Sequence, residues 1–311
     1  MEYALLSLLI ILALCILRES RNVMMIIYMC IFSLVASITY FVFGSPDVAM
    51  AEAAVGAFTT IFFVICFEKY HDLKLEESAS PERLVFKLRN LKKYIAPLGF
   101  TALLFGLFLY FVPSGEINTY LKDQYLSQFM YDIGGENAVT AIYLGYRVYD
   151  TLFEALVLIV SVIAVTHMSY SDDETVLDGQ HSDVERSVFV HAVIRVVSAV
   201  ILVFGVYLIT HGHISAGGGF QGGLFIAAFF VCRYLVYNIF DLPVAKILRV
   251  EEFIFSFTVL IVIIVIFVGA MDHLPPIFQD VYMIVMNLLI GTKVGCGFII
   301  LFYRYMAIER R

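Results

Sequence analysis

Residues 253–271 read FIFSFTVLIVIIVIFVGAM and contain no charged side chain. A helix needs about 20 apolar residues to cross the hydrocarbon core of a bilayer, so this run is long enough to span a membrane. The rest of the chain has the same character, because 61% of its 311 residues are hydrophobic and 15% are charged. Soluble domains carry about 25% charged residues. The sequence therefore predicts an integral membrane protein.

Eight further apolar runs accompany this one. In a bilayer the backbone polar groups must be satisfied within each segment, which favours helices. We therefore predict an all-α integral membrane fold of about nine transmembrane helices, in blocks of three, two and four. The first run lacks the basic start and the cleavage site of a signal peptide, so we expect a retained helix. The eight runs lie at residues 3–17, 23–43, 48–67, 94–112, 148–168, 188–209, 220–239 and 281–303.

The positive charges predict the orientation of the chain. If nine helices cross with the N-terminus outside, most of the 20 Lys and Arg residues fall in inner loops, and only Lys122 and Arg147 remain in outer ones. The positive-inside rule then gives an N-out, C-in topology. We expect a multi-pass protein of the cell membrane whose surroundings are the lipid bilayer.

Three longer connections divide the chain into domains. They are a charged inner segment at 68–93, an outer segment with room for a short surface helix at 113–147, and an acidic inner linker at 169–187. We predict a three-helix domain at 1–93, a two-helix domain with the outer loop and the linker at 94–187, and a four-helix domain at 188–311.

Several function classes are disfavoured by the composition. The chain has no basic patch for nucleic acid and no large soluble domain for a catalytic cleft, so we do not expect an enzyme. The five cysteines fall inside apolar runs without a C-x-x-C spacing, which indicates small buried hydrophobes. We expect neither a metal site nor a cofactor.

Acidic residues near the start of two spans are the first candidates for function, because charge inside a bilayer is costly. Asp47 suits the positive N-terminal end of its helix and is interpreted first as a helix-terminal charge. Glu52 lies about 7 Å deeper by helical rise, so we interpret it as functional. Arg147, Asp150 and Glu154 share one helical face; the first two are expected to pair near the outer interface, and Glu154 is a deeper functional candidate.

Basic residues inside spans form a second group. His191 and Arg195 are spaced i, i+4 near an inner end, where Arg195 could extend to the interface. Lys293 lies about twelve residues from either end of the last run, so it has no such route. We therefore predict that Lys293 faces a carboxylate, a polar cavity or both.

A glycine-rich segment joins the sixth and seventh runs. No Lys-Ser or Lys-Thr pair follows the glycines and no strand precedes them, so a nucleotide-binding loop is excluded. Two histidines alone do not define a metal site. We interpret the segment as a tight re-entrant turn with backbone N–H groups open to polar neighbours. Its candidate residues are His211, His213, Gly217, Gly218, Gly219, Gln221 and Gly222.

These motifs together resemble a known family of membrane subunits. The stretch 46–57, PDVAMAEAAVGA, resembles the small three-helix domain at the end of the large Mrp antiporter subunit, which is a separate subunit in membrane-bound hydrogenases. Residues 137–141 with 146–155 resemble the neighbouring two-helix domain. Residues 211–223 with 291–295 resemble the four-helix MnhB-type subunit.

The resemblance implies a subunit of the sodium/proton antiporter module. Its partners would be other Mrp-type membrane subunits, including large antiporter-like ones. The complex would be a free-standing Mrp antiporter or a redox-driven relative of respiratory complex I with a hydrogenase or ferredoxin-dependent oxidoreductase module. By position, Glu52, Glu154 and Lys293 would be ion-path residues.

Two hypotheses follow for the chain itself. In the first, these charges line a route for Na⁺ or H⁺, with Glu52 and Glu154 receiving ions from the outer side and Lys293 exchanging charge partners. In the second, the chain is a non-conducting structural or coupling subunit whose charges pair statically. A stand-alone transporter is disfavoured because the sequence shows no internal repeat at matching positions.

Overall fold

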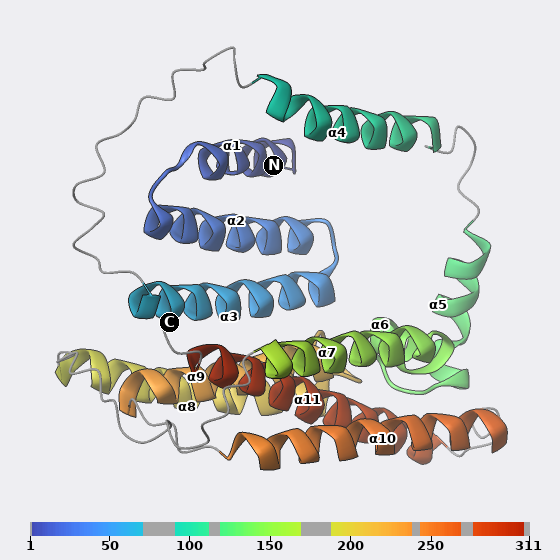
Figure 1. The fold of residues 1–311 in the computed structure, drawn as a ribbon. Coiled ribbons are helices and arrows are strands. Elements are labelled where there is room, and N and C mark those ends of the chain that lie inside the picture. Colours follow the sequence, from blue (N-terminus) through green and yellow to red (C-terminus); the bar gives the residue numbers. More distant parts are fainter. Residues whose placement is uncertain are drawn as a thin grey trace. The chain divides into compact units, whose positions relative to one another are not determined.

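The computed structural model describes residues 2–70, 91–111, 119–168, 188–237, 243–268 and 276–307. Within these ranges the chain is helical, with short turns and no strand (Figure 1). The helices are α1 (Glu2–Arg18), α2 (Asn22–Val42), α3 (Pro46–Tyr70), α4 (Leu91–Phe111), α5 (Tyr120–Asp132), α6 (Ala138–Ala141), the π-helical turn η3 (Ile142–Tyr146), α7 (Val148–Met168), α8 (Val188–His211), α9 (Gly219–Tyr237), α10 (Val244–Val268) and α11 (Pro276–Ala307).

Each of the nine apolar runs lies on one of these helices, which confirms the all-α membrane fold. Six of the helices in the described ranges are long and apolar enough to cross a bilayer, namely α2, α3, α7, α8, α10 and α11. Helices α4 and α9 carry shorter apolar stretches, at Gly99–Tyr110 and Gly219–Tyr234. The number of nine crossings and the orientation stay predictions.

The chain forms two compact units. The smaller one, residues 72–127, contains α4 and the start of α5, where the Thr119 hydroxyl donates to Asp123 at 2.7 Å across the first turn. Helix α5 is the short helix that we predict in the outer segment. The predicted acidic linker at 169–187 lies outside the described residues, as does most of the inner segment at 68–93.

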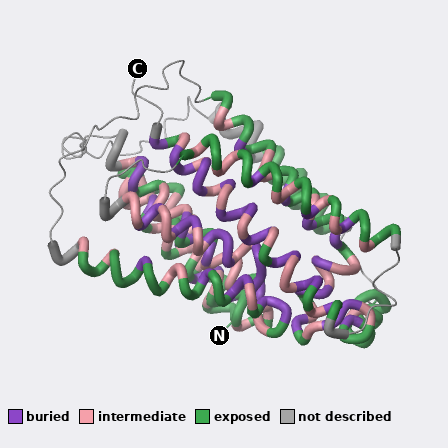
Figure 2. The backbone as a smooth tube through the Cα atoms, turned by 90° about the horizontal axis from the view of Figure 1, so that it is seen from below, coloured by how far each residue is buried: buried purple, intermediate pink, exposed green. Residues whose placement is uncertain are grey.

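The larger unit, residues 1–71 with 128–311, is built around α11. This helix packs against α7, α8, α9 and α10, and it is the most buried of the membrane-length helices described. Helices α2 and α3 pack together, and α3 also contacts α9. Buried positions gather where helices meet, and exposed positions follow the outward faces (Figure 2).

Glycines bring α9 and α11 into backbone contact. A Cβ atom at Gly219 would lie 2.6 Å from the carbonyl oxygen of Asn287, and one at Gly223 would lie 2.5 Å from that of Gly291. Both helices thus carry glycines four residues apart, Gly219 with Gly223 and Gly291 with Gly295. This is how small residues let membrane helices approach closely.

Two helices begin earlier than the apolar runs that predict them. Helix α10 starts at Val244 rather than at residue 253, and α11 starts at Pro276 rather than at 281. A hydropathy run marks the stretch that suits lipid, whereas a helix continues through polar residues until its hydrogen-bond ladder ends. The consequence for α10 is that Glu251 lies two turns inside the helix.

Candidate functional site

Lys293 faces a carboxylate, as its mid-span position predicts. Its Nζ lies 3.2 Å from Glu251 Oε1, and the two side chains are 1% and 0% exposed. Lys293 comes from the middle of α11 and Glu251 from the first half of the neighbouring α10. The pair is therefore a fully buried ion pair between two membrane-length helices, where each charge depends on the other for compensation.

The surroundings of this pair are apolar and closely packed. The Phe255 ring centroid lies 5.6 Å from Lys293 Nζ, which places the cation over an aromatic face. A Cβ atom at Gly297 would lie 3.4 Å from Glu251 Oε1 and 3.2 Å from Leu158. Glu251 Oε2 is buried and has no hydrogen-bond partner among the described residues.

Glu154 lies on α7, on the other flank of α11. It is close enough to Lys293 for the two charges to attract each other, but no described group forms a hydrogen bond or ion pair with its carboxylate. Its side chain is exposed on the surface of this chain. The structure thus brings together two candidates predicted separately, Lys293 and Glu154, and adds a third residue, Glu251.

Sequence reasoning missed Glu251 because the apolar run begins two residues after it, which places the carboxylate outside the span. The sequence does contain a signal for Glu251. Glu251, Phe255 and Thr258 are spaced i, i+4 and i+7, so they share one face of α10. Thr258 is also buried. The polar members of this face mark it as turned toward protein rather than lipid.

Asp47 has partners from two distant segments. Its Oδ1 accepts a hydrogen bond from Asn137 Nδ2 at 2.9 Å and another from the Gly217 backbone N–H at 3.2 Å. The residue is 9% exposed. The interpretation as a helix-terminal charge accounts for its place on α3 but not for these contacts.

The glycine-rich segment is a tight turn, as predicted. Gly217 and Gly218 have φ angles of +150° and +153°, which residues with side chains rarely adopt. Besides the Gly217 N–H, the Gly219 N–H finds a polar partner, Asn287 Oδ1, at 3.1 Å. The next helix, α9, begins directly at Gly219.

The other candidate residues of this segment do not form one cluster. His211 is exposed and stacks on Tyr207, with ring centroids 4.5 Å apart, whereas His213 is buried. Gln221 lies half-buried near Gly218, and Gly222 packs against α8, where a Cβ atom would lie 2.6 Å from the Gly205 carbonyl oxygen. The segment is therefore a packing and hydrogen-bonding element.

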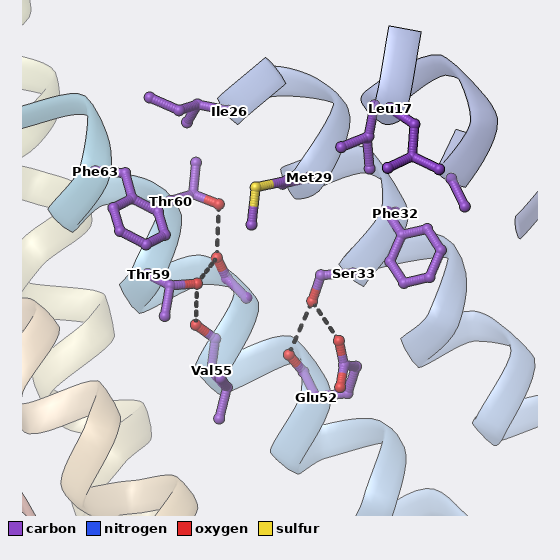
Figure 3. A pocket seen from close by; sticks show the side chains of 13 residues that line it. Leu17, Ile26, Met29, Phe32, Ser33, Glu52, Val55, Thr59, Thr60 and Phe63 are labelled. Atoms are coloured by element: carbon purple, nitrogen blue, oxygen red, sulfur yellow. Dashed lines mark hydrogen bonds between the residues drawn. The ribbon is translucent and has the colours of Figure 1, made fainter. Parts of the chain in front are cut away.

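Glu52 lies in a different place, at a cavity of about 490 Å³ between α1, α2 and α3 (Figure 3). The Ser33 hydroxyl donates to Glu52 Oε1 at 2.8 Å. The lining is otherwise mostly apolar, with the hydroxyls of Thr59 and Thr60 bonded to carbonyl oxygens of their own helix. No described hydrogen bond or ion pair joins Glu52 to Lys293.

The remaining charged candidates lie near helix ends. Asp150 forms the predicted ion pair with Arg147, and both side chains are exposed. On α8, His191 is half-buried and Arg195 is exposed. No ion pair of Arg195 is found among the described residues.

The π-helical turn η3 fixes where α7 begins. Its carbonyl groups, displaced from the regular ladder, find other donors: the Thr151 hydroxyl donates to the Tyr143 oxygen at 2.7 Å, and the Tyr282 hydroxyl donates to the Leu144 oxygen at 3.0 Å. Because Tyr282 belongs to α11, this turn attaches the start of α7 to the helix that carries Lys293.

Comparisons with known proteins agree with this architecture. Residues 189–308 match the family model of a domain related to the MnhB subunit of Na⁺/H⁺ antiporters, and residues 7–72 match the family model of MbhD, one of the MBH subunits. The Na⁺/H⁺ antiporter subunit A1 of Staphylococcus haemolyticus is 30% identical over 168 residues, which are 54% of this chain and 20% of that protein. The chain is similar to Mrp-type membrane subunits in both regions.

Solved structures extend this similarity. A chain of the archaeal membrane-bound sulfane sulfur reductase, a respiratory membrane complex, aligns with a TM-score of 0.59 and 27% identity, over 71% of this chain and 100% of that one. A chain of the Mrp complex from Dietzia sp. DQ12-45-1b shares the fold, with a TM-score of 0.64 and 20% identity over 95% of this chain and 34% of that one. The subunit spans about half or less of the length of its curated relatives.

The candidate residues fall in different matched regions. The Lys293–Glu251 pair and the glycine-rich turn lie in the MnhB-related region, and Asp47 and Glu52 lie in the region that matches MbhD. Glu154 lies between the two regions. The predicted domain boundaries at residues 93 and 187 stay predictions.

Proposed function

We propose that this chain is an Mrp-type membrane subunit that takes part in cation translocation. The observation that carries the proposal is the buried ion pair between Lys293 and Glu251, with a third charge, Glu154, beside it. Ionisable groups at such depth in membrane helices typically belong to ion pathways or proton relays. The ion is Na⁺ or H⁺, as in the antiporters whose subunits this chain resembles.

The charged residues provide stations at several depths. With nine crossings and the N-terminus outside, Glu52 lies in the outer half of the membrane, Lys293 and the neighbouring Glu154 lie near the midplane, and His191 with Arg195 lies in the inner half. An ion that crosses about 30 Å of hydrocarbon needs polar groups at several depths. In this proposal Glu52 and Glu154 receive ions from the outer side.

A redox-driven complex is the proposed setting. The similarity to a whole chain of the membrane-bound sulfane sulfur reductase and the match to MbhD support it. The proposed partners are other Mrp-type subunits, including large antiporter-like ones, and an oxidoreductase or hydrogenase module. The chain itself has no catalytic role in this proposal, and the ion coupling belongs to the complex.

A second candidate is a structural or coupling subunit that does not conduct. The contacts of Asp47 favour it, because they tie α3 to Asn137 and to Gly217 through hydrogen bonds that need no movement. In this alternative the Lys293–Glu251 pair fixes helix packing and stays closed.

Transport by the purified complex in liposomes separates the two candidates. We expect Lys293→Ala to lower ion-coupled flux at least tenfold, with the complex still assembled on size-exclusion chromatography. The matched control is Lys246→Ala, because Lys246 is exposed near the start of α10 and should leave flux unchanged. An assembled Lys293→Ala complex with normal flux would favour the structural role.

A further inference from the structure

We propose that Glu251 is the resting partner of Lys293 and that Glu154 is its second partner, so that Lys293 moves between the two carboxylates as an ion passes. The inference rests on the proposed function and names the groups that act in it. It begins from the position of one cation between two carboxylates, one in contact with it and one with no hydrogen-bond or ion-pair partner among the described residues.

The two carboxylates flank α11 at the same level. Helices α7, α10 and α11 pack against one another (Figure 1). Tyr282 of α11 reaches Leu144 ahead of α7, and Gly297 further along α11 meets Leu158 further along α7, so the two helices run in the same direction. Lys293 lies one turn before Gly297, and Glu154 lies one turn before Leu158. Glu154 is therefore level with Lys293.

Glu251 approaches the same place from α10. Its Oε1 lies 3.2 Å from Lys293 Nζ and next to Gly297, where a Cβ atom would be 3.4 Å away. Gly297 thus lies between the Glu251 carboxylate and Leu158 of α7. Lysine has a flexible four-carbon stem with a compact charge, which suits movement between two nearby anions.

The two carboxylates differ in a way that gives the exchange a direction. Glu251 is fully buried and no described group forms a hydrogen bond with its Oε2, so this oxygen can accept a proton or ligate Na⁺. Either event neutralises Glu251 and removes its attraction for Lys293. Glu154 is exposed and has no hydrogen-bond or ion-pair partner among the described residues, so the ammonium group moves to it. When Glu251 loses the ion, the original pair forms again.

Two further titratable groups of the described part of the chain lie near this cluster. From α11 the Cys296 thiol lies near both Glu251 and Lys293, and from α10 itself Glu252 lies near Glu251. Glu154 is the group from α7. Glu252 is exposed and does not contact Lys293, which makes it a matched control for the carboxylate that does.

The test uses the whole complex carrying Glu154→Gln, Glu251→Gln or Glu252→Gln, with thermal stability and ion-coupled flux measured on each. Glu154→Gln removes an unpaired, exposed charge, so we expect an unchanged unfolding midpoint and at least a tenfold loss of flux. Glu251→Gln should lower the unfolding midpoint and the flux, because Lys293 loses its resting partner. Glu252→Gln should change neither.

A double variant, Lys293→Met with Glu251→Gln, distinguishes a switch from a static pair. It removes both buried charges, so we expect stability to recover relative to Glu251→Gln while flux stays at least tenfold below wild type. Normal flux in the double variant or in Glu154→Gln would overturn the exchange and leave the proposed function standing. Absence of flux from the wild-type complex would overturn both.

Discussion

Asn137 connects three parts of the chain through one side chain. Its Oδ1 caps α6 by accepting from the Val139 N–H at 3.0 Å, and its Nδ2 lies within 2.9–3.1 Å of Asp47 Oδ1 and of the carbonyl oxygens of Gly212 and Ser215. It is 8% exposed. Because water cannot replace these hydrogen bonds at a buried position, the side chain contributes more than an ordinary helix cap.

We predict that Asn137→Ala destabilises the chain by about 2–4 kcal/mol, since it removes an N-cap and the two amide hydrogens that a buried carboxylate and two carbonyl oxygens share. The measurement is the unfolding midpoint of the detergent-purified complex. Gln124→Ala, at an exposed position of α5, is the control and should leave the midpoint unchanged. An unchanged midpoint for Asn137→Ala would contradict the role of this side chain.

A second residue-scale prediction concerns the kind of charge at Lys293. In Lys293→Arg the charge is kept, but a guanidinium binds a carboxylate through two parallel hydrogen bonds and does not release its proton. We expect the complex to assemble and its flux to fall at least tenfold. Flux at the wild-type level would mean that a permanent positive charge is sufficient.

At this scale the sequence predicts single charges better than their partners. Lys293 is identified because its depth can be counted along one helix. Lys293 and its partner Glu251 are 42 residues apart in the sequence, and Asp47 and Gly217 are 170 residues apart. Such pairings depend on how helices pack, and no local pattern in one sequence records that packing.

At the scale of the helix, the contact between α9 and α11 depends on the absence of side chains. The backbones meet at Gly219 and Gly223 on one helix and at Gly291 and Gly295 on the other.

The sequence predicts well where helices form, since each apolar run is a local property. The ends of α10 and α11 are not well predicted, because polar residues continue both helices beyond the lipid-like run.

We predict that Gly223→Val separates α9 from α11, because the position leaves no room even for a Cβ atom beside the Gly291 carbonyl oxygen. The expected result is loss of assembled complex on size-exclusion chromatography and a lower unfolding midpoint. Gly106→Val on α4 is the control, since a Cβ atom there meets no atom within 4 Å. Full assembly of the Gly223→Val complex would show that this contact adjusts easily.

At the scale of the whole molecule, the fold alone does not determine which side of the membrane each terminus faces. The Lys and Arg distribution predicts N-out and C-in, and helix packing is the same in either orientation. Side chains of single cysteines placed in the loops test this directly, since the five natural cysteines lie within helices.

We predict that a cysteine at Lys122 in oriented vesicles reacts with an impermeant maleimide from outside, while one in the 68–93 segment reacts only after the membrane is opened. The reason is that the 68–93 segment contains seven Lys and Arg residues, whereas the outer loops contain only Lys122 and Arg147. The control is a cysteine at the C-terminal Arg311, which should behave like the inner segment. External labelling of the inner segment would show that the topology is the reverse of the predicted one.

The wide turn at η3 has a consequence for the phase of the helix that follows it. A π turn holds one more residue than an α turn, and one residue corresponds to a rotation of about 100° around the axis. The direction in which Glu154 projects is thus set by the number of residues between Asn137 and Val148.

Deleting Gly145 from this turn should rotate α7 against α6 and carry Glu154 away from α11, so that flux is lost although no charged residue has changed. Substituting Gly145 by Ala keeps the count, and the added methyl would only have to displace the Ile133 side chain. Flux of the two variants, compared at equal assembly, measures whether phase alone disables the subunit.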